Sequence, residues 1–278
     1  MSSINIKIGI KTSLCFLLIF CYTISFSGCN RVENDTLQKP NKALTIISYC
    51  AKETTEKNQI YFHYPLFDNS IQNADIINTL IENYVAVSLQ SICQGGFHGD
   101  LRQSPVNWEW NNGDYSLQAM YIQYSVVCDS SELFSIKFEG IYNNKSSINP
   151  MNYFNTLNID MINGKPIVIS DLYNINSDFI DLIQKNFNEQ MLDWIDDTKA
   201  NLPNAVEEIF NIYDDDSLLK TFNNLNKNVN KDIENGFFVF FEKNFLGISI
   251  PISNALGDHF EIMIAYEELA PFKKEKAQ

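Results

Sequence analysis

The chain has 278 residues and a formal net charge of −14 at pH 7, from 20 basic and 34 acidic side chains. An acidic balance of this size repels phosphate groups, which argues against nucleic acid and anionic lipid as partners and permits attraction to basic proteins or cations. The same charge also suits a protein that only has to stay soluble at a cell surface. The length fits one large domain or two small ones.

The first 28 residues have the pattern of a secretory signal. Lys7 and Lys11 form a positive flank, and residues 14–26 are an almost entirely apolar run that is too short to span a bilayer comfortably. The run ends in Phe-Ser-Gly-Cys, which resembles the lipobox of bacterial lipoproteins, with Phe in place of the usual Leu. We therefore predict an extracytoplasmic protein of the bacterial cell envelope that is anchored to a membrane by lipidated Cys29. The alternative is an ordinary secretory signal in which Cys29 is incidental.

Residues 29–42 are polar, contain Pro40 and lack apolar periodicity, which is typical of a flexible tether. Two subdomains are expected to follow. The first is an N-terminal α+β subdomain at residues 43–173. The second combines a helical segment with antiparallel strands at residues 174–270, and a tail occupies residues 271–278.

The N-terminal subdomain is expected to contain five strands and one helix before its last turn. Pro65 would end the second strand or place it at a sheet edge. Asn69 or Ser70 is expected to cap the helix, and Asn163-Gly164 to form a type I′ turn with both residues at positive φ, leading into a further strand and a helix start. Apolar periodicity predicts the elements in this order: strands at 43–49 and 59–64, a helix at 69–87, and strands at 117–128, 132–142 and 153–162.

The C-terminal part begins with a long helix, which Ser177 is expected to cap. Two shorter helical segments and three strands follow, at 203–213, 217–225, 237–241, 245–252 and 259–266. Strands are grouped apart from helices along the chain, which predicts an α+β fold. We expect antiparallel sheets with helices packed on one face.

Recognisable catalytic and metal motifs are missing from the sequence. The chain has three histidines, at His63, His98 and His259. None has H-x-x-x-H spacing, and His98 with Asp100 would supply only two ligands. The segment around Ser249 lacks the second glycine of a nucleophile elbow, so Ser249 is expected on the polar face of a strand and a triad with Asp258 and His259 has little support. We predict no metal, no cofactor and no identified catalytic residue.

Three cysteines follow Cys29 in the mature chain, at Cys50, Cys93 and Cys128. At most one disulfide can form among them. None has the C-x-x-C spacing of a zinc or thioredoxin-like site.

Two stretches resemble a known pair of domains of unknown function. Residues 115–173, with LFSIKFEGIY and TLNIDMINGKPIVISDLY, resemble the domain that precedes the catalytic domain in PdaC-type peptidoglycan deacetylases. Residues 237–269, FFVFFEKNFLGISIPISNALGDHFEIMIAYEEL, resemble its companion domain. The same pair forms the extracellular part of RsiV, a lysozyme-sensing anti-sigma factor. The resemblance covers most of residues 58–270 and implies an extracytoplasmic α+β module that binds something at the cell wall. No deacetylase domain or sigma-binding segment is expected in this chain, so neither function carries over whole.

The long loop at residues 95–114 contains His98, Trp108 and Trp110. Aromatic side chains on loops can stack on sugar rings or anchor a protein interface, and the alternative is that both tryptophans cap the open end of the sheet. We predict a lipid-anchored binding module for a cell-wall glycan or a cationic protein such as a lysozyme, with no nucleic-acid partner. The alternatives are a cell-envelope hydrolase or an accessory protein to one, with an unrecognised site, and a structural lipoprotein.

Overall fold

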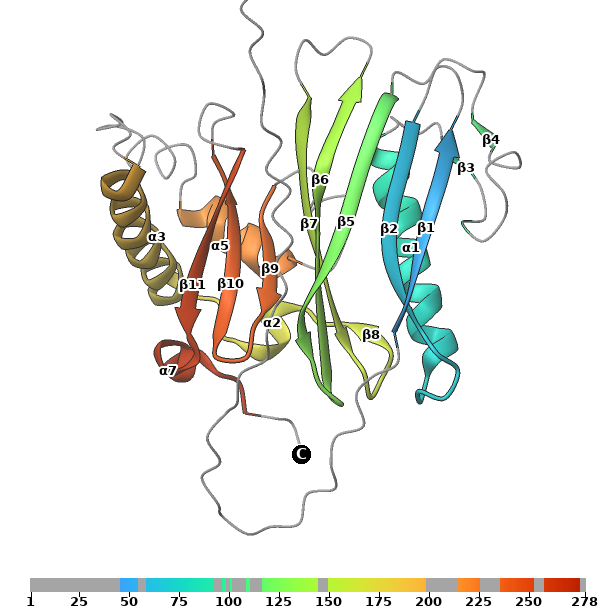
Figure 1. Ribbon diagram of the computed structural model, residues 1–278. Coiled ribbons are helices and arrows are strands. Elements are labelled where there is room, and N and C mark those ends of the chain that lie inside the picture. Colours follow the sequence, from blue (N-terminus) through green and yellow to red (C-terminus); the bar gives the residue numbers. More distant parts are fainter. Residues whose placement is uncertain are drawn as a thin grey trace, which may run out of the picture. The chain divides into compact units, whose positions relative to one another are not determined.

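The computed structural model describes ten stretches of the chain (Figure 1), which are residues 46–54, 59–92, 97–98, 101, 109–110, 117–144, 150–198, 215–225, 236–252 and 258–275. Contacts group residues 41–278 into one compact unit. The predicted signal and tether, Cys29, Trp108 and the helix predicted at 203–213 lie outside the described residues. Among the described helices, none is both long and apolar enough to cross a membrane.

A six-stranded sheet, a three-stranded sheet and their helices confirm the predicted α+β fold class (Figure 1). The six-stranded sheet has the order β1-β2-β5-β6-β7-β8. Its strands are β1 (Ile46–Thr54), β2 (Gln59–Phe67), β5 (Leu117–Asp129), β6 (Leu133–Asn144), β7 (Met151–Asp160) and β8 (Lys165–Pro166). The antiparallel three-stranded sheet has the order β11-β10-β9, made of β9 (Phe238–Phe241), β10 (Phe245–Pro251) and β11 (His259–Ala265). A third, two-stranded sheet pairs β3 (Phe97–His98) with β4 (Glu109–Trp110).

One strand pair is parallel, which corrects the prediction of purely antiparallel sheets. β2 and β5 run parallel over 59–62 and 119–122. The chain between them contains α1 (Ala74–Ile92), and such a crossover returns the chain in the same direction. Residue periodicity reports the face of a side chain and not the direction of a strand, so it could not show this pair. Pro65 does not end β2, which runs on to Phe67, and β2 is not an edge strand, which corrects the predicted position. Pro65 lies opposite Ser48 of β1, beyond the segment that pairs with β5, so β2 pairs there with β1 alone.

α1 begins after the predicted cap positions Asn69 and Ser70. Those residues belong to a turn in which the Asp68 carboxylate accepts the Ser70 N–H at 2.9 Å. Asn73, at a φ of 61°, immediately precedes the helix and donates from its side chain to the Ile162 carbonyl oxygen at 2.8 Å. The helix start therefore depends on a partner 89 residues away in sequence, which local pattern does not reveal.

The turn between β7 and β8 is not the predicted type I′ turn. Gly164 has a φ of 62°, whereas Asn163 is not in the positive-φ region, and the pairing of Asp160 with Lys165 leaves a four-residue loop. The Asp160 carboxylate organises this loop by accepting the N–H groups of Ile162 and Asn163 at 2.9 and 3.0 Å. β8 ends at Pro166, so the predicted strand does not continue.

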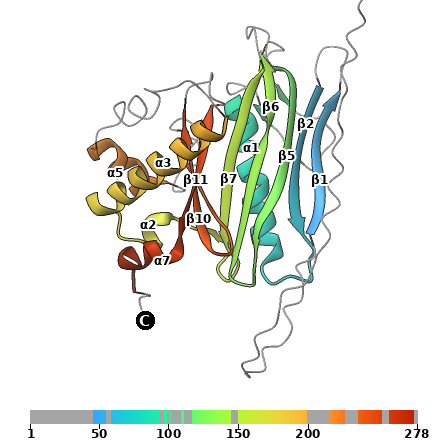
Figure 2. The same ribbon diagram turned by 60° about the vertical axis from the view of Figure 1, so that its left-hand side comes forward.

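Helices cover one face of each large sheet (Figure 2). α1 packs on the six-stranded sheet, while α3 (Ser177–Thr198) and α5 (Asp215–Asn224) pack on the three-stranded sheet. Short helices α2 (Ile169–Leu172), α7 (Tyr266–Leu269) and η4 (Ala270–Phe272) complete this side. The cap of α3 is Asn176 and not the predicted Ser177, because Asn176 Oδ1 accepts the Phe179 N–H at 3.0 Å.

Two large hydrophobic clusters follow from this arrangement, besides a small one of Phe154, Phe238 and Phe240. Ile60, Phe62, Ile81, Phe134 and Phe138 lie between α1 and the six-stranded sheet and are fully buried. A second cluster lies between the three-stranded sheet and its helices, and includes Phe179, Phe187, Phe222, Ile248 and Ile262. Contacts group both clusters in one unit, so the subdomain boundary at residue 173 stays a prediction.

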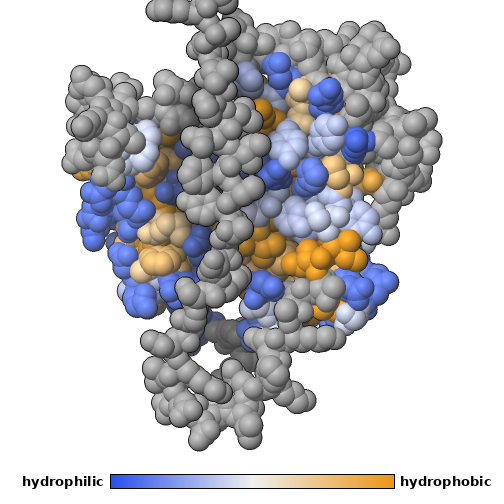
Figure 3. All heavy atoms as spheres, viewed as in Figure 1, coloured by the Kyte–Doolittle hydropathy of each residue, from blue (hydrophilic) through white to orange (hydrophobic). Residues whose placement is uncertain are grey.

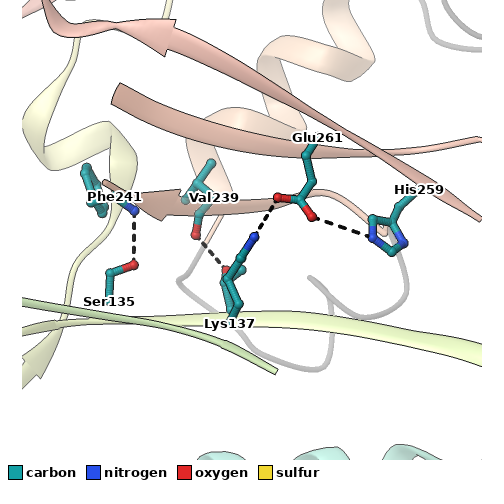
Figure 4. Close-up of polar contacts among 7 residues, drawn as sticks. Ser135, Lys137, Val239, Phe241, His259 and Glu261 are labelled. Carbon is teal, nitrogen blue, oxygen red and sulfur yellow. Dashed lines mark hydrogen bonds and ion pairs between the residues drawn. The ribbon is translucent and has the colours of Figure 1, made fainter. Parts of the chain in front are cut away.

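Side chains of the six-stranded sheet bind the backbone of the edge strand β9 (Figure 4). Thr156 Oγ1 and Asn158 Nδ2 donate to the Val239 carbonyl oxygen at 2.6 and 2.7 Å. The Phe241 N–H donates to Ser135 Oγ at 3.0 Å. These bonds satisfy backbone groups that an edge strand leaves unpaired. They also hold the polar face of β6 and β7 against the three-stranded sheet.

Candidate functional site

The structure places His98 and Trp110 of the predicted binding loop in the two-stranded sheet. Phe97 pairs with Trp110, and His98 pairs with Glu109. Trp108 lies outside the described residues, so the binding role of this loop stays a prediction.

A cluster of charged side chains lies between the two large sheets (Figure 4). Lys137 and Glu139 come from β6, and His259 and Glu261 come from β11; we call these four residues the inter-sheet cluster. Lys137 Nζ lies 2.8 Å from Glu261 Oε2, and His259 Nε2 lies 3.9 Å from Glu261 Oε1. Alternation along each strand puts its two residues on one face, and the packing of the sheets brings the faces together.

Aromatic rings surround the basic members of the inter-sheet cluster. The His259 ring lies 4.4 Å from the Phe154 ring, and Lys137 Nζ lies 4.5 Å from the centroid of Phe240. A cation over a ring face is attracted by the ring quadrupole. The Phe240 ring also lies over Gly247, where a Cβ atom would come within 2.1 Å of it, so any larger residue there requires this buried ring to move.

The pKa of His259 is lowered, chiefly because burial disfavours the charged imidazolium. The carboxylates of Glu261, Glu139 and Asp258 act in the opposite direction, and Lys137 acts in the same direction as burial. The imidazole is therefore neutral at neutral pH, and a neutral imidazole offers a nitrogen lone pair to a proton or a metal ion.

Ser249 lies on the polar face of a strand, as predicted, but that face is covered. It is fully buried in β10, opposite Glu261, because the six-stranded sheet covers the face that alternation marks as outward. Its hydroxyl has no hydrogen-bond partner within the described stretches. An enclosed hydroxyl does not meet a substrate, so a triad of Ser249, Asp258 and His259 gains no support.

The face of the six-stranded sheet that is turned away from α1 carries both hydrophilic and hydrophobic side chains (Figure 3). We call Tyr61, His63 and Tyr121 the aromatic platform. The ring centroids of Tyr61 and Tyr121 lie 6.3 Å apart, and those of His63 and Tyr121 lie 5.8 Å apart. Tyr121 is 46% exposed, its hydroxyl accepts a hydrogen bond from Gln123, and Lys52 Nζ lies 5.2 Å from the Tyr61 ring centroid.

A groove of about 300 Å³ lies beside the aromatic platform. Tyr61 and Tyr121 form part of its wall, together with Ile141, Tyr142 and Pro150. Ile141 is 49% exposed, so an apolar surface is open to solvent next to the two tyrosine rings.

A larger groove of about 980 Å³ is formed by the β5–β6 turn, the β9–β10 turn and the segments around Tyr173 and Tyr266. Burial raises the pKa of the Asp129 carboxyl on its wall. Its charged lining residues are Asp129, Glu132, Asp171, Glu242, Glu275, Lys243, Lys273 and Lys274, an excess of carboxylates over lysines.

None of these sites is predicted from the sequence, in which His259 is only one of three histidines without a metal motif. Lys137, Glu139 and Glu261 alternate with apolar residues, as solvated strand residues do. The alternation of Tyr61 and Tyr121 with apolar residues places them on outward faces, but it does not show that the two strands are neighbours.

Comparison with solved structures finds proteins of the DUF3298 family. A family member from Bacteroides fragilis matches with a TM-score of 0.50 and 14% identity, over 84% of this chain and 96% of its own. A DUF3298 protein from Pseudomonas aeruginosa matches with a TM-score of 0.47 and 10% identity, over 85% of this chain and 95% of its own. No family model matches the sequence, and a search of curated proteins finds no significant match. The protein therefore has a fold similar to that of a DUF3298 protein, and this likeness shows architecture alone.

Proposed function

We propose that the protein is a lipid-anchored, extracytoplasmic binding protein of the bacterial cell envelope, and that its aromatic platform binds a cell-wall glycan. The signal pattern that ends in Cys29 supports the anchor and the location. The DUF3298-like fold supports the resemblance to the extracellular domains of RsiV and PdaC-type deacetylases. The observation that carries the glycan assignment is the neighbouring pair Tyr61 and Tyr121 on an exposed sheet face.

The chemistry of the platform suits a sugar. Sugar rings have apolar C–H faces that stack on aromatic rings, and hydroxyl groups that need hydrogen-bond partners. The tyrosine hydroxyls and the side chains of Lys52 and Gln123 can supply such partners, and the groove of about 300 Å³ offers an apolar wall.

Binding of purified protein to peptidoglycan and to its soluble glycan fragments tests this proposal. Tyr121→Ala is expected to weaken binding about tenfold, because loss of a stacked ring removes roughly 1–2 kcal/mol. Tyr49→Ala is the matched control, since Tyr49 is 43% exposed and its register with Tyr64 places it on the opposite face of the sheet. Equal effects of the two substitutions, or no retention of the parent protein, would contradict the proposal.

A cationic protein such as a lysozyme is the second candidate partner. The net charge of −14 and the carboxylate excess in the groove of about 980 Å³ favour it. Retention of lysozyme that disappears at moderate salt and is unchanged by Tyr121→Ala would support this partner over the glycan. Turnover of wall material by the purified protein would instead indicate a cell-envelope hydrolase.

The anchor has its own test. Radiolabelled palmitate is expected to label the parent protein in cells and not the Cys29→Ala variant, since the thiol is the acyl acceptor. Labelling that survives this substitution would rule out Cys29 as the lipidated residue.

A further inference from the structure

The inter-sheet cluster has the composition of a metal site. Glu139, His259 and Glu261 each offer one ligand atom, and these atoms all lie within 4.8 Å of one another. Bonds from zinc to nitrogen or oxygen are about 2.0–2.2 Å long, so two ligand atoms of a tetrahedral ion lie roughly 3.4 Å apart. The farthest pair of ligand atoms therefore needs to close by up to about 1.4 Å. Glu139 is exposed, so it has room to make this movement.

Two buried oxygen atoms without partners in the described stretches adjoin these ligands. Ser249 Oγ belongs to a fully buried side chain directly opposite Glu261 in the β10–β11 register. Asp258 Oδ1 belongs to the residue before His259, and the other oxygen of Asp258 accepts a hydrogen bond from Asn152 at 2.8 Å. A bound ion and its water ligands would explain such unsatisfied groups.

The charge of the region also suits a divalent cation. The three carboxylates of Glu139, Asp258 and Glu261 outnumber the single ammonium of Lys137, an excess of two negative charges among these four groups. Lys137 Nζ contacts Oε2 of Glu261, while Oε1 lies on the side of His259. A metal ion between Oε1 and the imidazole nitrogen thus leaves the lysine contact in place.

We infer that the inter-sheet cluster binds a divalent transition-metal ion through Glu139, His259 and Glu261, while Lys137 keeps its contact with Glu261 and weakens binding by its charge. Imidazole together with carboxylate suits zinc among the common metal ions, and three protein ligands leave a position for water. Because the ligands come from β6 and β11, the ion would link the two large sheets.

Zinc titration of the full-length protein in detergent, after treatment with a chelator, tests the inference by calorimetry. One equivalent of Zn²⁺ is expected to bind. Glu139→Gln and His259→Gln are each expected to lower the affinity at least about tenfold. Lys137→Met is expected to raise the affinity, because Glu261 is then no longer neutralised by an ammonium group.

His63→Gln is the matched control, since it removes a histidine from β2 and should leave zinc binding unchanged. Glu139 is exposed, so the Glu139→Gln protein keeps its packing, which circular dichroism verifies. The inference is overturned if the parent binds no zinc, or if Glu139→Gln and His259→Gln bind it as the parent does. It is also overturned if the bound equivalent is lost with His98→Gln instead.

Discussion

Lys137 connects the two large sheets through a charged pair. The Lys137 and Glu261 side chains are 15% and 27% exposed, so both charges are largely removed from water. Their mutual attraction offsets the cost of this desolvation, and removal of one partner leaves the other charge uncompensated. Loss of one partner is therefore expected to cost more stability than the intact pair contributes to folding.

Replacement of Lys137 by methionine is expected to destabilise the protein by about 1–3 kcal/mol. The double variant Lys137→Met with Glu261→Met is expected to recover most of this loss, because no unpaired charge remains. Urea unfolding in the presence of a chelator measures both, with Glu139→Gln as an exposed control expected within about 0.5 kcal/mol of the parent. A double variant less stable than the single one would contradict this account.

Tyr153 is a second residue whose environment affects the stability of the fold, here through its pKa. Burial raises the pKa of its phenol to about 12, while hydrogen bonds from neighbours act in the opposite direction. The unfolded chain, with an ordinary pKa near 10, loses its proton first as the pH rises. Stability from this group is therefore present below about pH 10 and is lost as the pH approaches 12.

Tyr153→Phe is expected to flatten part of the alkaline loss of stability, because the phenol that resists ionisation is removed. Urea unfolding at pH 8 and pH 11 measures this, and Tyr121→Phe, at an exposed position, is the control. An alkaline loss as steep as that of the parent would show that other buried tyrosines dominate.

The sequence does not reveal the inter-sheet cluster, because its members lie far apart along the chain. His259 attracts notice as a rare residue beside Asp258, but Lys137 and Glu261 are separated by 124 positions. Each occupies an ordinary outward place in its own strand. Only the packing of β11 over β6 joins them, and strand alternation carries no information about which faces meet.

At the scale of elements, side-chain amides bind the ends and edges of the sheets. Gln190 of α3 accepts the Met263 N–H and donates to the Met263 carbonyl oxygen, both at 2.9 Å, on the edge strand β11. Asn78 of α1 forms the same two bonds with Phe67 in β2, at 2.7 and 2.9 Å. An amide that pairs with both backbone groups takes the place of a neighbouring strand.

Gln190→Leu is expected to cost about 1–3 kcal/mol, because the Met263 backbone groups lose their partners. The opened β11 edge is also expected to increase association at high protein concentration. Thermal unfolding and light scattering measure the two effects, and Asn188→Leu on the exposed side of α3 serves as the control. Equal behaviour of the two variants would mean that the amide does not protect the edge.

Most elements could be predicted because their periodicity is local, as in β5, β6, β7 and the three C-terminal strands. Helix starts and turns were less accessible. Asn73 determines the start of α1, and Asp160 determines the loop between β7 and β8. Both act through hydrogen bonds that the pattern of apolar residues does not encode. The parallel pairing of β2 with β5 could not be predicted either. It depends on the path that the chain takes through α1, which the pattern of apolar residues does not encode.

At the scale of the whole molecule, polar side chains form a junction between the two large sheets and their two large hydrophobic clusters. Thr156, Asn158 and Ser135 bond to the backbone of β9, and Lys137 with Glu261 continues the junction toward β11. Polar side chains define one register between the sheets, because each donor has to meet its acceptor, whereas apolar surfaces tolerate sliding. The hydrogen bonds therefore define the relative position of the two large sheets more narrowly than hydrophobic packing alone would.

The docking of β9 onto this junction also sets an order of events during refolding. β5, β6 and β7 are joined by successive hairpins, whereas Thr156 and Val239 are 83 residues apart, and closure of a long loop is entropically slow. Pulse-labelling hydrogen exchange is expected to protect amides of β6 before those of β9. The strands β5, β6 and β7 would thus form first, and β9 would pack against them afterwards.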